Sequence, residues 1–190
     1  MIREIVVIGA SVGGLAAMQV ILPALPEDLP VPLVFVQHRV KSGDSGLCKY
    51  LQQWSRLPIV EPEDKEGIRP RRVYLAPRDY HLLIERGSFA LSTEAPVAYA
   101  RPSIDALFES AADVYQESVI GVVLTGTGQD GARGLAKIKA LGGLAVVEDP
   151  ATAEARAMPE AAIAATRVDR ILPLTEIAPF LAGLYRPLVR

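Results

Sequence analysis

The hydrophobic residues of this chain fall into two kinds of segment that alternate along it. Continuous apolar runs, typical of strands buried on both faces of a parallel sheet, occupy residues 5–8, 32–38, 119–124 and 144–147. Between and after them, helical spacing or composition predicts helices at residues 15–22, 47–54, 102–117, 132–141, 151–165 and 176–184, with a last short strand at 171–172. The helix at 151–165 is expected to be interrupted at Met158-Pro159. This alternation predicts an α/β fold, a doubly wound and mainly parallel sheet with helices on both faces.

Residues 59–92 depart from this pattern. Short apolar runs at 73–76, 81–84 and 89–91 are separated by turn signals at 77–79 and 86–88. We therefore expect a small antiparallel meander inserted into the α/β fold. His81 begins one of its strands, where a surface position or a satisfied core role is expected. For Trp54 and Cys48 we expect packing in the core.

Composition narrows the class of protein. The chain has 190 residues, of which 50% are hydrophobic and 22% are charged, as expected for one globular domain. A formal net charge of −2 argues against a general nucleic-acid binder, and the single cysteine excludes an internal disulfide. Residues 5–26 carry no charge but contain three glycines and two prolines, so a strand, a turn and a helix explain them better than membrane insertion does.

The first strand leads into a glycine-rich turn that contains one hydroxyl group. Ser11 lies between Gly9 and the pair Gly13-Gly14, just before the first helix, where free backbone N–H groups gather. Such a turn could present Ser11 as a nucleophile. It could equally bind a pyrophosphate in the manner of a Rossmann fold, or simply connect the strand to the helix.

Two further polar residues follow buried strands in the same way. His38 comes at the end of the second strand, and Asp130 lies in the loop after the strand at 119–124. The carboxyl ends of parallel strands form one edge of a sheet, so Ser11, His38 and Asp130 can meet there. A serine needs an imidazole to take its proton, and the imidazole needs a carboxylate that fixes its tautomer and stabilises its charge.

A nucleotide-binding interpretation competes with this triad. Gly126-x-Gly128-x-x-Gly131 matches the dinucleotide fingerprint, and Glu148 stands where the acid that binds the ribose is expected. The turn around Ser11 also resembles the start of a short-chain dehydrogenase. However, no tyrosine of the chain has a lysine four residues later, and no Gly-Lys-Ser/Thr of a P-loop occurs.

Several separate blocks, in order, resemble the catalytic domain of the CheB-type chemotaxis receptor methylesterases. They are Ile8-Gly9-Ala10-Ser11-x-Gly13-Gly14, Val36-Gln37-His38, Val73-Tyr74-Leu75-Ala76-Pro77, Arg101-Pro102-Ser103-Ile104-Asp105-x-Leu107-Phe108, Leu124-Thr125-Gly126-x-Gly128-x-Asp130-Gly131-Ala132 and Met158-Pro159-x-Ala161-Ala162. The resemblance implies that Ser11 is the nucleophile, His38 the base and Asp130 the orienting acid. It also implies hydrolysis of methyl esters on receptor glutamates, with deamidation of receptor glutamines in some members.

The resemblance carries further expectations. It implies no metal or organic cofactor, a cytoplasmic location, and partners among the cytoplasmic regions of methyl-accepting chemoreceptors, a receiver domain or other chemosensory proteins. The backbone N–H groups near Val12 and Thr127 are candidates for an oxyanion hole. Competing interpretations are a nucleotide-dependent oxidoreductase and a catalytically silent relative that only binds receptors.

The chain departs from the family pattern at three points. Val12 replaces a frequent threonine, Thr127 replaces a frequent methionine, and Glu148-Asp149 replaces glutamine-aspartate. Because a backbone N–H can bind an oxyanion whatever the side chain, we expect the first two changes to leave the chemistry intact. We also expect residues 1–190 to form a single methylesterase-type catalytic domain with no receiver domain.

Overall fold

The computed structural model describes residues 3–39, 46–97 and 99–185. Within them, seven strands form one sheet: β1 (Ile5–Ala10), β2 (Leu33–Gln37), β3 (Ile59–Val60), β4 (Val73–Leu75), β7 (Val119–Val123), β8 (Leu144–Glu148) and β9 (Arg170–Leu172). Their spatial order is β3-β4-β2-β1-β7-β8-β9, and all the pairings are parallel. A separate antiparallel hairpin joins β5 (His81–Glu85) to β6 (Ser88–Ser92). The predicted parallel sheet with a small antiparallel insertion is confirmed.

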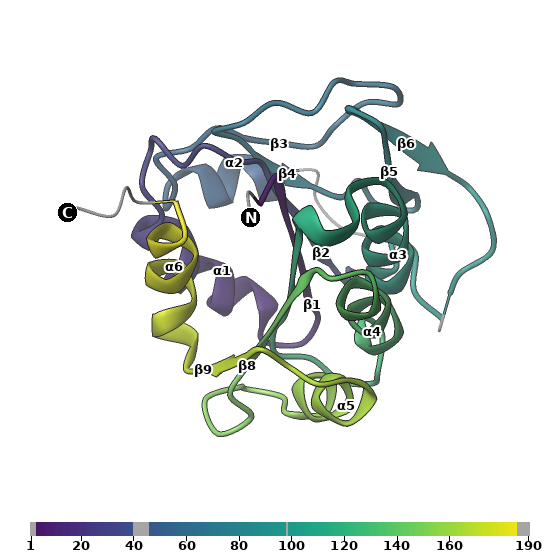
Figure 1. Cartoon of the computed structure of the whole chain (residues 1–190). Coiled ribbons are helices and arrows are strands. Elements are labelled where there is room, and N and C mark those ends of the chain that lie inside the picture. The colour runs from purple at the N-terminus through teal and green to yellow at the C-terminus, as the bar shows by residue number, and fades with distance from the viewer. Residues whose placement is uncertain (1–2, 40–45, 98, 186–190) are drawn as a thin grey trace.

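Helices cover both faces of the sheet (Figure 1). They are α1 (Gly14–Ala24), α2 (Leu47–Gln52), α3 (Ile104–Tyr115), α4 (Ala132–Ala140), α5 (Ala157–Ala165) and α6 (Leu174–Gly183), with a 3₁₀ turn at Gln116–Ser118. One core lies between the sheet and α1, α2 and α6. The other lies between the sheet and α3, α4, α5 and the hairpin.

Strand β1 shows why the sequence folds in this way. Its side chains alternate between the two cores, with Val6 and Ile8 in the first and Ile5 and Val7 in the second. All six residues of β1 are buried. A strand with apolar side chains on both faces needs cover on both, which the two helical layers provide.

Some local predictions were wrong. Strand β4 belongs to the main sheet beside β2 and is not part of an antiparallel meander. Trp54 is 43% exposed rather than in the core, whereas Cys48 is partly buried against the first core. Helix α5 begins at Ala157 rather than at residue 151, so Pro159 lies in its first turn, where proline is tolerated.

The loop predicted after His38 lies partly outside the described residues, since residues 40–45 are not among them. Helix α1 extends through Pro23 to Ala24, two residues beyond the predicted end at residue 22. In the described part of the chain, no helix combines the length and the hydropathy that a membrane crossing requires.

Candidate functional site

The three predicted residues lie at the carboxyl ends of three adjacent strands. β1 lies between β2 and β7 in the sheet. Ser11 follows β1, His38 follows β2 and Asp130 lies in the loop after β7. Because the helices after β1 and β7 pack on opposite faces, this is the switch point of the sheet, where ligands of α/β proteins bind.

A pocket of about 540 Å³ opens at this edge. Its lining comes from the strand ends and from the segment between the hairpin and α3: Ser11, His38, Arg39, Pro96, Tyr99, Ala100, Arg101, Pro102, Thr127, Gly128, Gln129 and Asp130. All three candidate residues therefore face one cavity. The structure thus brings together the residues that sequence spacing could only place at a common edge.

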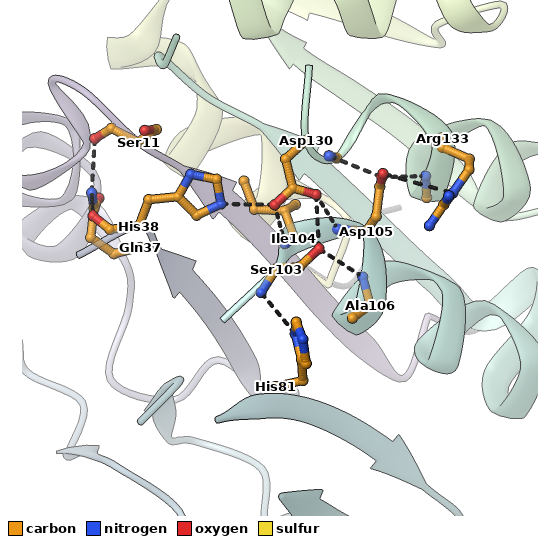
Figure 2. Close-up of polar contacts among 12 residues, drawn as sticks. Ser11, Gln37, His38, His81, Ser103, Ile104, Asp105, Ala106, Asp130 and Arg133 are labelled. Atoms are coloured by element: carbon orange, nitrogen blue, oxygen red, sulfur yellow. Dashed lines mark hydrogen bonds and ion pairs between the residues drawn. The ribbon is translucent and has the colours of Figure 1, made fainter. Parts of the chain in front are cut away.

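His38 and Asp130 are in direct contact. The Nε2 atom of His38 lies 2.7 Å from Oδ2 of Asp130, and the two side chains are 19% and 4% exposed. In Figure 2 the imidazole lies between Ser11 and Asp130. Among the described residues no hydrogen bond joins Ser11 Oγ to His38. Because Nε2 of His38 is bound to Asp130, a contact between the imidazole and a nucleophile would have to form at Nδ1.

Asp130 is held by the N-terminus of α3. Its Oδ1 accepts hydrogen bonds from Ser103 Oγ and the Asp105 N–H, each at 2.9 Å, and its Oδ2 accepts one from the Ile104 N–H at 2.7 Å. Burial opposes ionisation, but the hydrogen bonds from His38 and from the backbone of Asp105 and Ile104 outweigh it and lower the pKa of Asp130. The carboxylate is therefore charged at neutral pH.

Asp105 performs the reciprocal role for α4. Its Oδ1 accepts from the N–H groups of Gly131 and Gly134, at 2.9 and 2.7 Å. Burial raises the pKa of Asp105 despite these two hydrogen bonds. Each helix thus has its free N-terminal donors bound by a carboxylate from the neighbouring segment, which fixes the Asp130 loop against α3.

This exchange of carboxylates argues against the dinucleotide interpretation. A pyrophosphate would need the free N–H groups at the start of α4, but Asp105 already binds those of Gly131 and Gly134. Glu148 does not face an open ribose site either. It is 1% exposed and accepts a hydrogen bond from the Thr125 N–H at 2.8 Å. Burial raises the pKa of Glu148, against the effect of that hydrogen bond.

The turn that carries Ser11 is held from two sides. The Ser11 N–H donates to the carbonyl of Thr125 at 3.0 Å, and Gln37 Nε2 donates to the Ser11 carbonyl at 2.8 Å. The left-handed backbone conformation of the turn lies at Gly13, with φ of 80°, which glycine adopts without strain, rather than at Ser11. Ser11 therefore projects into the pocket from an unstrained position, unlike the strained serine of a nucleophile elbow.

Two backbone N–H groups remain available beside Ser11. Within the described residues, neither the Val12 nor the Thr127 N–H donates a hydrogen bond. Thr127 lines the pocket, and Val12 follows Ser11 directly. Unused backbone donors near a serine are the kind of group that a developing oxyanion requires.

Sequence reasoning missed the residues that support this site. Gln37 also donates to the His38 carbonyl at 3.0 Å, so one amide links the main chains of Ser11 and His38. Ser103 and Asp105 entered only as letters of a motif, although both fix the Asp130 loop. Their position at the start of the helix predicted over residues 102–117 was the available signal.

Comparisons with known proteins place the chain in one family. The family model described as CheB methylesterase matches residues 6–181. A Leptospira interrogans protein, named provisionally as a protein-glutamate methylesterase/protein-glutamine glutaminase, is 50% identical over 92% of this chain and 91% of its own length. An Anaeromyxobacter dehalogenans protein named for the same two activities is 43% identical over 96% of this chain, which spans 54% of that protein.

A solved structure shows the same fold. The crystal structure of the Thermotoga maritima CheB methylesterase catalytic domain superimposes with a TM-score of 0.91 at 36% identity, covering 97% of this chain and all of that one. The family model covers nearly the whole sequence and the structural match covers nearly the whole fold. The chain belongs to the CheB methylesterase family.

Proposed function

We propose that this protein is a protein-glutamate methylesterase that removes methyl groups from glutamate side chains of chemoreceptors in the cytoplasm, and that it also deamidates receptor glutamines. The observation that carries the proposal is the 2.7 Å hydrogen bond between His38 Nε2 and Asp130 Oδ2 in a pocket that Ser11 also lines. The names of its relatives supply the class of substrate.

The reaction begins at Ser11. As the Ser11 Oγ attacks the ester carbonyl carbon, the proton passes to Nδ1 of His38, because Nε2 is bound to Asp130. The charged Asp130 stabilises the imidazolium that forms and keeps its plane directed at the pocket. The N–H groups of Val12 and Thr127 bind the oxyanion of the tetrahedral intermediate.

The intermediate then collapses. His38 returns its proton to the leaving oxygen, methanol departs, and an ester between Ser11 and the glutamyl group remains. A water molecule attacks this acyl-enzyme, with His38 again as base, and releases the free glutamate carboxylate. With glutamine as substrate, the same steps release ammonia instead of methanol.

The test is methanol release from a methylated cytoplasmic fragment of a chemoreceptor. We expect Ser11→Ala to lower turnover by about three orders of magnitude or more, as loss of a triad nucleophile does. Ser110→Ala is the matched control, since its hydroxyl lies in α3 and contacts Ile84 and Leu107 rather than the pocket. Near-wild-type methanol release by Ser11→Ala would rule the mechanism out.

A covalent probe separates catalysis from binding. Phenylmethylsulfonyl fluoride should sulfonylate the Ser11 oxygen with loss of fluoride, which mass spectrometry of the digested protein would locate. A protein that binds the receptor fragment but neither reacts at Ser11 nor releases methanol would be a catalytically silent relative, contrary to the proposal.

A further inference from the structure

The second histidine of the chain occupies a position that the proposed chemistry does not use. His81 begins β5 and is 2% exposed. Both of its ring nitrogens are engaged by the backbone. Nδ1 accepts a hydrogen bond from the Ser103 N–H at 3.2 Å, and Nε2 lies 3.1 Å from the Ala95 carbonyl. Because Nδ1 accepts a hydrogen bond and Nε2 faces a carbonyl oxygen that can only accept one, His81 is the neutral tautomer with its proton on Nε2.

The two partners of His81 are the ends of one wall of the pocket. The segment from Ala95 to Ser103, described except for residue 98, leads from the hairpin to α3. It contributes five of the lining residues, namely Pro96, Tyr99, Ala100, Arg101 and Pro102. His81 therefore links both ends of this wall to the first residue of β5.

At the Ser103 end the contact continues into the triad. Ser103 is fully buried, and its hydroxyl donates to Asp130 Oδ1 at 2.9 Å. Asp130 in turn binds His38. Figure 2 shows the continuous series of contacts from His81 through Ser103 and Asp130 to His38. The backbone of Ser103 is thus fixed by one histidine, while its side chain orients the acid that serves the other.

We infer that His81 is a positioning residue with two separable effects, one on Asp130 through Ser103 and one on substrate binding through Ala95. This inference rests on the proposed methylesterase function. The Ser103 contact should govern kcat, because it fixes the acid of the triad. The Ala95 contact should govern KM, because it holds the end of the pocket wall that is remote from Asp130.

Two amide substitutions separate these effects. The oxygen of an asparagine side chain lies at the level of Nδ1, so His81→Asn keeps an acceptor for the Ser103 N–H but gives up the donor to Ala95. The amide of a glutamine reaches the level of Nε2, so His81→Gln keeps the donor to Ala95 and gives up the acceptor. Neither side chain titrates.

For His81→Asn we expect KM for the methylated receptor fragment to rise about 5- to 50-fold, with kcat within about threefold of wild type. For His81→Gln we expect kcat to fall about 5- to 50-fold, with KM within about threefold. Ser110→Ala is the matched control, because it breaks another hydrogen bond between α3 and β5, from the Ile84 N–H, at a point remote from Asp130. It should lower thermal stability and leave both constants unchanged.

A spectroscopic measurement on the unaltered protein completes the test. Long-range ¹H–¹⁵N spectra of the two histidines should show His81 as the neutral tautomer with its proton on Nε2. A proton on Nδ1 would overturn the inference even if both variants failed to fold, because Nδ1 could then not accept from Ser103. Parallel changes of kcat and KM in both variants, or wild-type kinetics in both, would overturn it as well. A wild-type protein that releases no methanol would instead refute the proposed function and leave the tautomer as a separate readout.

Discussion

Asp130→Asn is the substitution for which the structure gives the most detailed expectation. The carboxylate accepts four hydrogen bonds, from His38 Nε2, Ser103 Oγ and the N–H groups of Ile104 and Asp105. An amide has only one oxygen, so its NH₂ group must face one of the two backbone donors. If the asparagine oxygen takes the place of Oδ2, His38 Nε2 and the Ile104 N–H keep their acceptor. The NH₂ group then takes the place of Oδ1, where the Ser103 hydroxyl can rotate to accept from it, and only the Asp105 N–H is left without a partner.

The opposite orientation is worse, because the NH₂ group would face both His38 and the Ile104 N–H. We therefore expect the first orientation, which costs one buried and unsatisfied N–H, about 1–3 kcal/mol in the free energy of unfolding. The pKa of Asp130 is lowered in the folded protein, so its contribution to stability is present above the unfolded pKa of about 3.9 and is lost as pH falls through the folded value. The destabilisation of the variant should accordingly shrink below about pH 4.

Turnover should fall for an electrostatic reason. In the expected orientation His38 keeps the tautomer with its proton on Nε2, so the loss does not come from a reversed imidazole. It comes from the missing charge beside the imidazolium. Two unit charges about 4 Å apart attract by about 4 kcal/mol at an effective dielectric constant of about 20, which corresponds to about 10³ in rate. Because the amide dipole restores part of this attraction, we expect kcat to fall by about 10²- to 10³-fold.

The assay combines methanol release with urea unfolding between pH 3 and pH 8. Asp113→Asn is the control, since Asp113 is an exposed acid of α3 paired with Lys137, and removing such a pair changes stability by less than about 1 kcal/mol. A loss of turnover below about tenfold would refute the assignment of Asp130 as the charged partner of His38. An unchanged free energy of unfolding would refute the argument from its four donors.

Two further predictions test the surroundings of Ser11. Gly126→Ala should lower kcat at least tenfold, because a Cβ there would overlap Met158 Sδ and lie 2.8 Å from Ser11 Cβ. Gly183→Ala is the control, since a Cβ there meets nothing within 4 Å, and it should stabilise helix α6 by up to about 1 kcal/mol. Glu148→Gln should make the protein more stable than wild type at pH 7, with the difference vanishing towards pH 4, in unfolding curves recorded across that range. Burial raises the pKa of Glu148, so the wild type loses stability as the pH rises from the pKa of the unfolded chain, about 4.3, through the pKa of the folded protein. The glutamine of the variant does not ionise and can still accept the hydrogen bond from the Thr125 N–H. Equal pH dependence of the two proteins would contradict the second prediction.

The sheet and the place of the candidate residues could be predicted because both depend on local patterns. Strand β1 reads as a continuous apolar run, and the structure buries both of its faces. Once β1, β2 and β7 are parallel and adjacent, the residues that follow them must share one edge. The proximity of His38 and Asp130 therefore follows from topology, although their direct contact could not be derived from the sequence.

The supporting contacts could not be predicted in this way. His81 reaches partners 14 and 22 residues along the chain, and neither interval has a periodicity that marks it. Strand β4 was placed in the wrong sheet because it is short and its neighbours are hairpin strands. Its residues Val73, Tyr74 and Leu75 nevertheless form a continuous apolar run, and this was the available signal for a strand covered on both faces, as the structure shows it beside β2.

The position of Asp130 depends on how closely helices α3 and α4 approach each other. At Gly134 a Cβ would lie 2.5 Å from Phe108 Cβ and 3.2 Å from the Asp105 backbone, so α3 and α4 are closer there than any larger residue allows. The Gly134 N–H binds Asp105, while the Asp105 N–H binds Asp130. Any substitution that separates these helices therefore moves the acceptor of His38 as well as the core. It follows that stability and turnover should be lost together for variants between α3 and α4, whereas variants between α1 and α6, on the other face of the sheet, should lose stability alone.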